Sequence, residues 1–278
     1  MSNMQPFLTN RRATAVGIAL LALLVLGWYV ASDPLRLATH TPLTVGDYMG
    51  ATFCHRLTSH SFTIAGRQFP LCARCSGMYI GFMVILTVLL LAGRERWLAF
   101  PHWPHMLALV GLVAVMGVDG LNSVLASFPG GTPLYAPTNT LRLFTGLGTG
   151  LAMGTFLIPA VAQVLWRDAI WKPVIGSWGE LAGLIGLAGF VGLLLLSNVS
   201  AVSYVLALAS VAGVTFILAG INVIFVLVIF RRESLAERWT QVVLPLGIGL
   251  VLALGQIALG TTLRLSLVGT ITGFPGLE

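Results

Sequence analysis

The sequence contains very little charge. Only 9% of its 278 residues are charged, whereas 57% are hydrophobic, and the mean hydropathy is +0.93. A soluble protein typically has roughly 25% charged residues, so this composition excludes an ordinary soluble fold. The net charge is +6, but the cations stand at the ends of apolar runs. This placement indicates a membrane topology signal and argues against binding to nucleic acid.

The sequence also lacks the common catalytic signatures. It has no phosphate-binding loop, no H-E-x-x-H, no G-x-S-x-G and no pair of carboxylates at catalytic spacing. Its three cysteines form no C-x-x-C-H motif, so covalently attached haem is not expected. These absences favour a protein that is not an enzyme. They do not decide whether it has a catalytic activity.

Seven apolar runs are long enough to cross a bilayer, which takes about 20 residues in a helix. Outside a closed barrel, only helices satisfy their own backbone groups in lipid. We therefore predict an all-α, polytopic membrane helix bundle that forms a single domain over residues 1–278. The predicted transmembrane segments are 13–31, 77–93, 105–126, 139–166, 178–198, 203–230 and 239–260.

The first run follows Arg11 and Arg12, as in a signal peptide. Tyr29 stands where cleavage prefers a small residue, so we predict an uncleaved anchor. If the segments alternate in direction, nine cations fall on the N-terminal side and six on the other. The positive-inside rule then places the N-terminus in the cytoplasm and the C-terminus outside the plasma membrane. The polar connection 32–76 would form a small cysteine-rich cap on the outer face.

Small residues recur at four-residue spacing in two of the predicted segments. Gly146, Gly150 and Gly154 lie in the fourth, and Gly179 and Gly183 lie in the fifth. Such spacing lets helix backbones approach closely in a membrane. We predict packing within the chain, and contact with a second subunit is the alternative.

All three cysteines lie in or beside the cap. Cys72 and Cys75 form a C-x2-C knuckle that can bind one tetrahedral ion, with Cys54 as a third ligand. A fourth ligand could be His55 or His60, and His60 is sterically easier because adjacent residues seldom bind one ion. Three thiolates and one imidazole suit zinc. A disulfide or redox pair between Cys72 and Cys75, or three inert thiols, are the alternatives.

Two sequence blocks resemble a known family. The first is C-H-R, a gap with Ser-Phe, G-x-Q-x-P and then C-A-R-C-S-G-x-Y-x-G. The second is Asp-Gly in one predicted helix and N-x-L-R-x-x-T-G at the start of the next. Over about residues 45–155 the chain is similar to domain-of-unknown-function family 2085, an uncharacterised family of prokaryotic integral membrane proteins. The residues that carry the resemblance are Cys54, His55, Arg56, Ser61, Phe62, Gly66, Gln68, Pro70, Cys72, Ala73, Arg74, Cys75, Gly77, Tyr79, Gly81, Asp119, Gly120, Asn139, Leu141, Arg142, Thr145 and Gly146.

The resemblance implies a location in the prokaryotic inner membrane, and it implies no activity, since the family has none assigned. It also favours His55 as the fourth ligand, because the family pattern has the histidine directly after the first cysteine. His60 departs from that pattern, which has an arginine or another polar residue at this position.

One carboxylate stands inside an apolar segment. Asp119 lies in the third segment, where an unpaired charge is costly. Asn139 and Arg142 begin the fourth segment on the same side, so we predict an Asp119–Arg142 pair beneath the cap. This polar intramembrane site either fixes the helix register or binds a lipid, a quinone head group or a proton. The cap adds three cations, Arg56, Arg67 and Arg74.

Two functions are consistent with these features. The expected one is a non-catalytic membrane protein with a zinc-stabilised loop. It would serve as an accessory subunit bound to other integral membrane subunits and lipids, as in a respiratory or photosynthetic electron-transfer assembly. The alternative is a membrane enzyme or carrier for a lipid, a quinone or a small anion, with its site between the cap and Asp119/Arg142. Four protein ligands to the metal would favour the first function, whereas three ligands and a water would favour the second.

Overall fold

The computed structural model describes residues 5–128 and 130–273, without the side chains of residues 5–12 and 34. The side chains of Arg11 and Arg12, which contribute to the predicted orientation, therefore lie outside the described part. Within it, seven helices are long and apolar enough to cross a membrane, which confirms the predicted all-α polytopic bundle. They are α1 (Gln5–Ala31), α4 (Ala73–Leu91), α5 (Trp103–Ser127), α6 (Asn139–Leu165), α7 (Trp178–Leu196), α8 (Ser200–Ile229) and α9 (Trp239–Val268).

Local sequence signals set where several of these helices begin and end. The side chain of Thr138 accepts a hydrogen bond from Leu141 N–H at the start of α6, and Ser177 caps α7 in the same way. Gly269 closes α9 with φ of 77°, a left-handed conformation that suits glycine. α9 thus continues to Val268, past the end predicted at residue 260.

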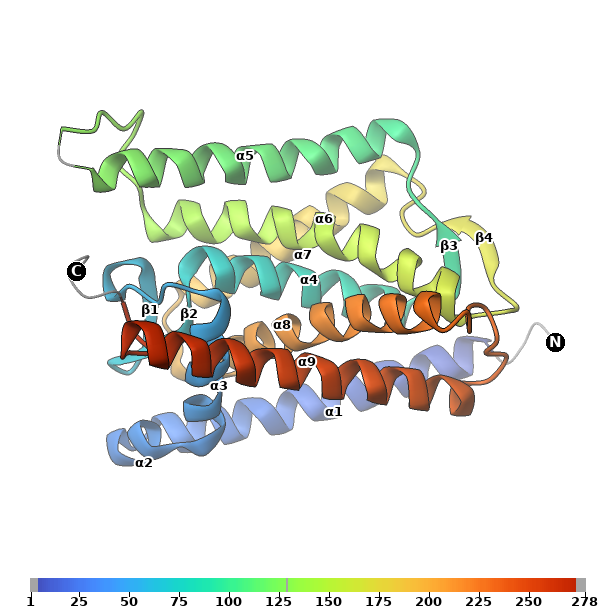
Figure 1. The fold of residues 1–278 in the computed structure, drawn as a ribbon, viewed down its shortest axis with the longest axis horizontal. Helices are drawn as coiled ribbons and strands as arrows, with labels where there is room; N and C mark the ends of the chain where they lie inside the picture. The colour runs from blue at the N-terminus through green and yellow to red at the C-terminus, as the bar shows by residue number, and fades with distance from the viewer. Residues whose placement is uncertain (1–4, 129, 274–278) are drawn as a thin grey trace.

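The seven helices run side by side along the long axis of the molecule, and α5 lies at one edge against α6 (Figure 1). The first residues of α1 and the last residues of α9 lie at opposite ends, as an odd number of alternating segments requires. The hydrophobic core runs through the bundle and includes Ile80, Leu143, Leu147 and Tyr204.

The closest helix pair is α4 with α6. A Cβ atom added at Gly146 or Gly150 would overlap backbone atoms of α4, and one added at Gly77 would overlap the backbone of α6. The predicted packing of the α6 glycines within the chain is therefore confirmed. For α7 the same prediction is wrong, because no atom of another element lies within 4 Å of a Cβ built at Gly179 or Gly183.

The cap contains two helices and a hairpin that the sequence analysis did not resolve. These elements are α2 (Pro34–Thr39), α3 (Thr41–Phe53), a 3-10 turn η1 (Thr58–His60), β1 (Ser61–Ile64) and β2 (Arg67–Cys72). β1 and β2 pair antiparallel through Ala65 and Gly66, whose positive φ angles suit a two-residue turn. Leu43 and Phe69 of the cap belong to the same buried core as the bundle, so the cap packs directly on the bundle.

At the other end of the bundle, two connections pair with each other. β3 (Trp97–Ala99) follows α4, β4 (Ile170–Pro173) follows α6, and the two strands run parallel (Figure 1). The guanidinium of Arg94 lies over the Trp97 ring, 4.5 Å from its centroid. The short strand pair fastens α4 to α6 at the end opposite the cap.

Candidate metal centre

Two cap elements and the first turn of α4 converge on the cysteines. Cys54 follows the last residue of α3, Cys72 ends β2, and Cys75 lies in the first turn of α4. One ligand atom from each of Cys54, His55 and Cys72 lies within 4.8 Å of the other two. The Cys54 and Cys72 thiols also lie within hydrogen-bonding reach of Cys75. All three cysteines are free thiols, and the structure brings all of them together.

Backbone donors support this arrangement. The Sγ of Cys54 accepts hydrogen bonds from Cys72 N–H at 3.1 Å and from Arg56 N–H at 3.4 Å. Arg56 has φ of 51°, and this left-handed turn directs the chain away directly after His55. Gln68 of the hairpin donates to the carbonyl of Arg56 at 2.9 Å and holds the turn in place.

The neighbouring thiols change one another's pKa. Hydrogen bonds from Cys54, from Cys75 and from His55 lower the pKa of Cys72 well below its ordinary value. The hydrogen bond to Cys72 raises the pKa of Cys54 to about 12. The cluster therefore stabilises a thiolate at Cys72, which is the form of cysteine that binds metal ions.

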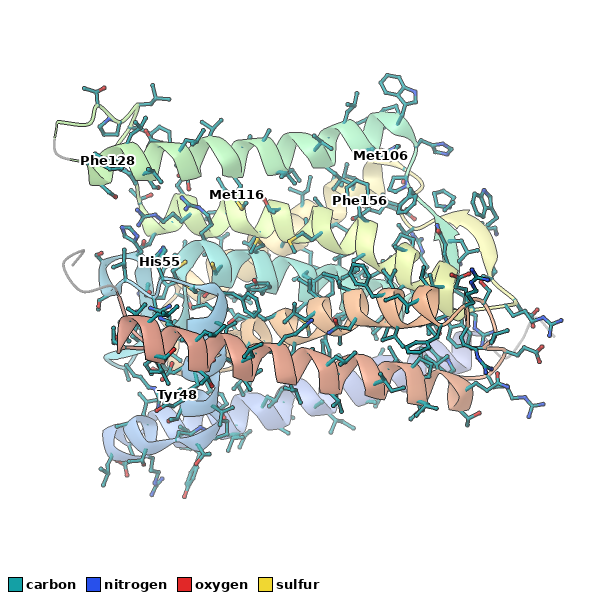
Figure 2. The ribbon with its side chains drawn as sticks, viewed as in Figure 1. Tyr48, His55, Met106, Met116, Phe128 and Phe156 are labelled. Carbon is teal, nitrogen blue, oxygen red and sulfur yellow. The ribbon has the colours of Figure 1, made fainter. Side chains whose placement is uncertain are left out.

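The two candidate histidines have different neighbours. Nδ1 of His55 accepts a hydrogen bond from Leu57 N–H at 3.1 Å, which leaves Nε2 as the nitrogen available to a ligand. Nε2 of His60 instead lies 3.2 Å from Nη2 of Arg142. Burial lowers the pKa of His60 to about 4, with a further contribution from Arg142. The structure thus places His55 with the thiols, and it does not follow the steric preference for His60. Figure 2 shows His55 at the cap end of the bundle.

Two of the cap arginines share a carboxylate. Asp47 of α3 accepts from Arg56 at 2.7 Å through Oδ1 and from Arg67 at 2.8 Å through Oδ2. Arg56 is buried, so this pairing offsets the cost of removing its charge from water. Asp47 was not among the predicted site residues, although Asp33 and Asp47 are the only acidic residues of the connection 32–76.

A residue near the C-terminus also reaches the cluster. Arg264 of α9 donates to the backbone carbonyls of Ala51, Cys54 and His55. These bonds fix the end of α3 against the last helix. The sequence offers little signal for this role, because no local pattern links Arg264 to the cap.

The predicted pair of Asp119 with Arg142 is wrong. Asp119 of α5 is buried and forms an ion pair with Arg74, whose Nε donates to Oδ2 at 3.1 Å. Tyr135 donates to the other carboxylate oxygen at 3.1 Å, and Ser123 accepts from Arg74 at 3.0 Å. Arg74 lies between the two cysteines of the knuckle, and the start of α4 directs its side chain toward α5.

Arg142 has uncharged partners instead. It donates to Oδ1 of Asn139 at 2.8 Å and contacts His60. Within residues 5–128 and 130–273 it forms no ion pair with a carboxylate, although its side chain is buried. Asn139 also donates to the carbonyl of Ser59 at 3.1 Å, so the start of α6 is tied to the cap.

Comparison with known proteins places this region in a family. A family model described as "Predicted membrane protein (DUF2085)" matches residues 54–156. An uncharacterized protein of Methanothermobacter thermautotrophicus is 30% identical over 101 residues, which cover 36% of this chain and 79% of that protein. The chain belongs to the DUF2085 family. An uncharacterized protein of Methanocaldococcus jannaschii is 26% identical over 115 residues, which cover 41% of this chain and 67% of that protein. No solved structure matches the chain.

The DUF2085 match starts at Cys54 and ends within α6. It therefore contains all three cysteines, both candidate histidines and the Arg74–Asp119 pair. Asp47 and Arg264 lie outside it. Membership of the DUF2085 family, expected from the motif, is confirmed, and the matched part of the chain is the part that builds the cluster.

Proposed function

We propose that the chain is a non-catalytic integral membrane protein whose cap is held on the bundle by one zinc ion. Its ligands would be Cys54, His55, Cys72 and Cys75. The observation that carries this proposal is that ligand atoms of Cys54, His55 and Cys72 lie within 4.8 Å of one another, with the free thiol of Cys75 in hydrogen-bonding reach of the two other thiols. Zinc prefers this donor set and tetrahedral geometry.

The ligand count favours a structural role over a catalytic one. Four protein ligands fill a tetrahedral site, whereas a catalytic zinc keeps one position for water or substrate. The ion would join the end of α3, the hairpin and the start of α4. Free energy of metal binding is then available to stabilise the cap, as in other small metal-bound folds.

A thiol redox role fits the structure less well. Cys72 precedes the first residue of α4 and Cys75 follows three residues later, which is the layout of a reactive C-x-x-C pair. A thiol that exchanges with another protein must be accessible, and only 3% of the Cys72 surface is exposed. Burial of the sulfur favours a metal ligand over an exchanging thiol.

The proposal includes a place in the membrane and a role beside other subunits. We propose that the N-terminus faces the cytoplasm and the cap faces outward across a prokaryotic inner membrane, because of the distribution of cations. The glycine face of α7 supports contact with a neighbouring subunit. Gly186 and Gly189 have no atom within 4 Å of an added Cβ, and such faces pack membrane helices together. An accessory subunit of an electron-transfer assembly is one such role.

Metal content of the purified chain tests the zinc proposal. We expect one zinc per chain by elemental analysis. His55→Asn lowers the zinc content because it removes one ligand, and His60→Asn is the matched control, since His60 contacts Arg142 instead. Zinc that is absent from the native chain, or that is lost from His60→Asn but kept by His55→Asn, would contradict the ligand set.

A second candidate function rests on Arg142. Its buried charge has no carboxylate partner in the described part of the chain, so a small anion could bind there in a carrier or an enzyme. We expect phosphate to raise the melting temperature of the native chain and not of Arg142→Gln if this function holds. An equal shift in the two proteins would exclude this site.

A further inference from the structure

An apolar cavity opens between four helices, away from the cysteines. It has a volume of about 490 Å³ and is lined by α1, α4, α7 and α8. Near the cap α1 packs closely on α8, where a Cβ at Gly27 would lie 2.8 Å from the Tyr204 ring. Leu20 and Leu23 lie earlier in α1, farther from the cap, and their side chains line the cavity. Thr87 supplies the one hydroxyl of its lining.

A second cavity lies next to the first, nearer the end of the bundle opposite the cap. It has a volume of about 270 Å³ and shares Val88 and Leu187 with the first as walls. Arg94 and Glu180 line its outer part. Val88 and Leu187 stand between the two cavities, and charged side chains line only the second one.

The charge at that end is positive. Arg94 pairs with Glu180 at 2.6 Å and donates to the carbonyl of Val174 at 2.9 Å. The Nζ of Lys172 lies 5.8 Å from the centroid of Trp97, the same ring that Arg94 covers. No carboxylate within the described residues pairs with Lys172. Arg94 and Glu180 offset each other, so Lys172 is a cation near this end that has no carboxylate partner in the described part of the chain.

We propose that these two neighbouring cavities bind one acyl chain of an anionic phospholipid, with its phosphate beside Arg94 and within reach of the exposed Lys172 side chain. An acyl chain needs only apolar walls, which are what the larger cavity provides. A quinone ring would need hydrogen-bond donors or aromatic neighbours, and the lining of the larger cavity has only Thr87. The charge of Lys172 favours an anionic head group over a zwitterionic one. This site is independent of the proposed zinc ion.

Native mass spectrometry of the delipidated full chain tests this site. The probes are phosphatidylglycerol and phosphatidylethanolamine, added separately. We expect one tightly bound phosphatidylglycerol per chain. Ala209→Phe places a ring in the cavity and lowers phosphatidylglycerol binding by about tenfold, the effect of displacing about two buried methylenes. Ala258→Phe is the control, because Ala258 is exposed on α9, outside the cavity.

The head-group end has its own pair of variants. Lys172→Gln lowers the preference for phosphatidylglycerol over phosphatidylethanolamine by about fivefold. Arg167→Gln, which removes an exposed cation at the same end, leaves the preference unchanged. Equal binding of the two lipids by the native chain would overturn the proposal. The proposal would also be overturned if Ala209→Phe and Ala258→Phe lowered phosphatidylglycerol binding equally. The same holds if Lys172→Gln and Arg167→Gln changed the lipid preference equally.

Discussion

Arg74 and Asp119 form the ion pair that joins the cysteine knuckle to α5. Arg74 stands between Cys72 and Cys75, so the same short segment supplies two sulfurs and the cation that binds α5. α5 lies at the edge of the bundle, beside α6 (Figure 1). The position of α5 is therefore linked to the geometry of the proposed metal ligands.

Removal of the Asp119 charge should destabilise the protein. Asp119→Asn leaves Arg74 without its carboxylate, and we expect a loss of about 2–3 kcal/mol in unfolding free energy. This value is below that of a fully buried pair because 22% of the Arg74 side chain is exposed. Unfolding in detergent, followed by circular dichroism, measures the change.

The matched control is Glu237→Gln, which breaks the pair with Arg167. That pair is largely exposed, with 67% of the Arg167 side chain accessible, so the expected loss is below about 1 kcal/mol. If Asp119→Asn lowers the unfolding free energy no more than Glu237→Gln does, the Arg74–Asp119 pair has no special role in placing α5.

The α4–α6 contact predicts a strong effect at one glycine. Gly150→Ala introduces a methyl group against the backbone of Met78, and we expect a loss of about 1–3 kcal/mol from overpacking. Gly183→Ala lies in open space on α7 and should be neutral or stabilising by about 0.4–1 kcal/mol in the isolated chain. Melting temperatures of the two variants in one detergent test this contrast. Equal losses would mean that α4 and α6 do not approach as closely as the structure shows.

Asp47 should be the most important carboxylate of the cap. Asp47→Asn leaves the buried Arg56 and its neighbour Arg67 without their anion, and we expect a loss of about 3 kcal/mol. The loosened cap should also be cut faster in limited proteolysis between Ser32 and Gly66. Asp33→Asn, which removes an exposed pair with Arg36, is the control and should leave the cleavage rate unchanged. Equal cleavage of the two variants would show that Asp47 does not hold the cap.

The helices could be predicted from the sequence because each apolar run is bounded by polar or cap-forming residues. The rotation of each helix about its axis could not, since the apolar runs are hydrophobic on nearly every face. For this reason the sequence led to a predicted Asp119–Arg142 pair, whereas the actual partner of Asp119 is Arg74. The small elements of the cap were also missed, because short helices and a hairpin leave weak periodic signals.

The cysteines illustrate the same limit at the site. The sequence predicted one site formed by Cys54, Cys72 and Cys75 with His55 or His60, and the structure groups Cys54, His55 and Cys72 with Cys75 close to the other two thiols. Spacing could not choose between His55 and His60, because the choice depends on the turn at Arg56 and on the contact of His60 with Arg142. Asp47 and Arg264 support the cluster through hydrogen bonds that join distant parts of the chain, which no local pattern reveals.

X-ray absorption at the zinc edge of the purified chain tests the central proposal most directly. The account predicts three sulfur neighbours at about 2.3 Å and one nitrogen neighbour at about 2.0 Å, with no water in the first shell. A protein that contains no metal, or a metal bound only by nitrogen and oxygen, would contradict it.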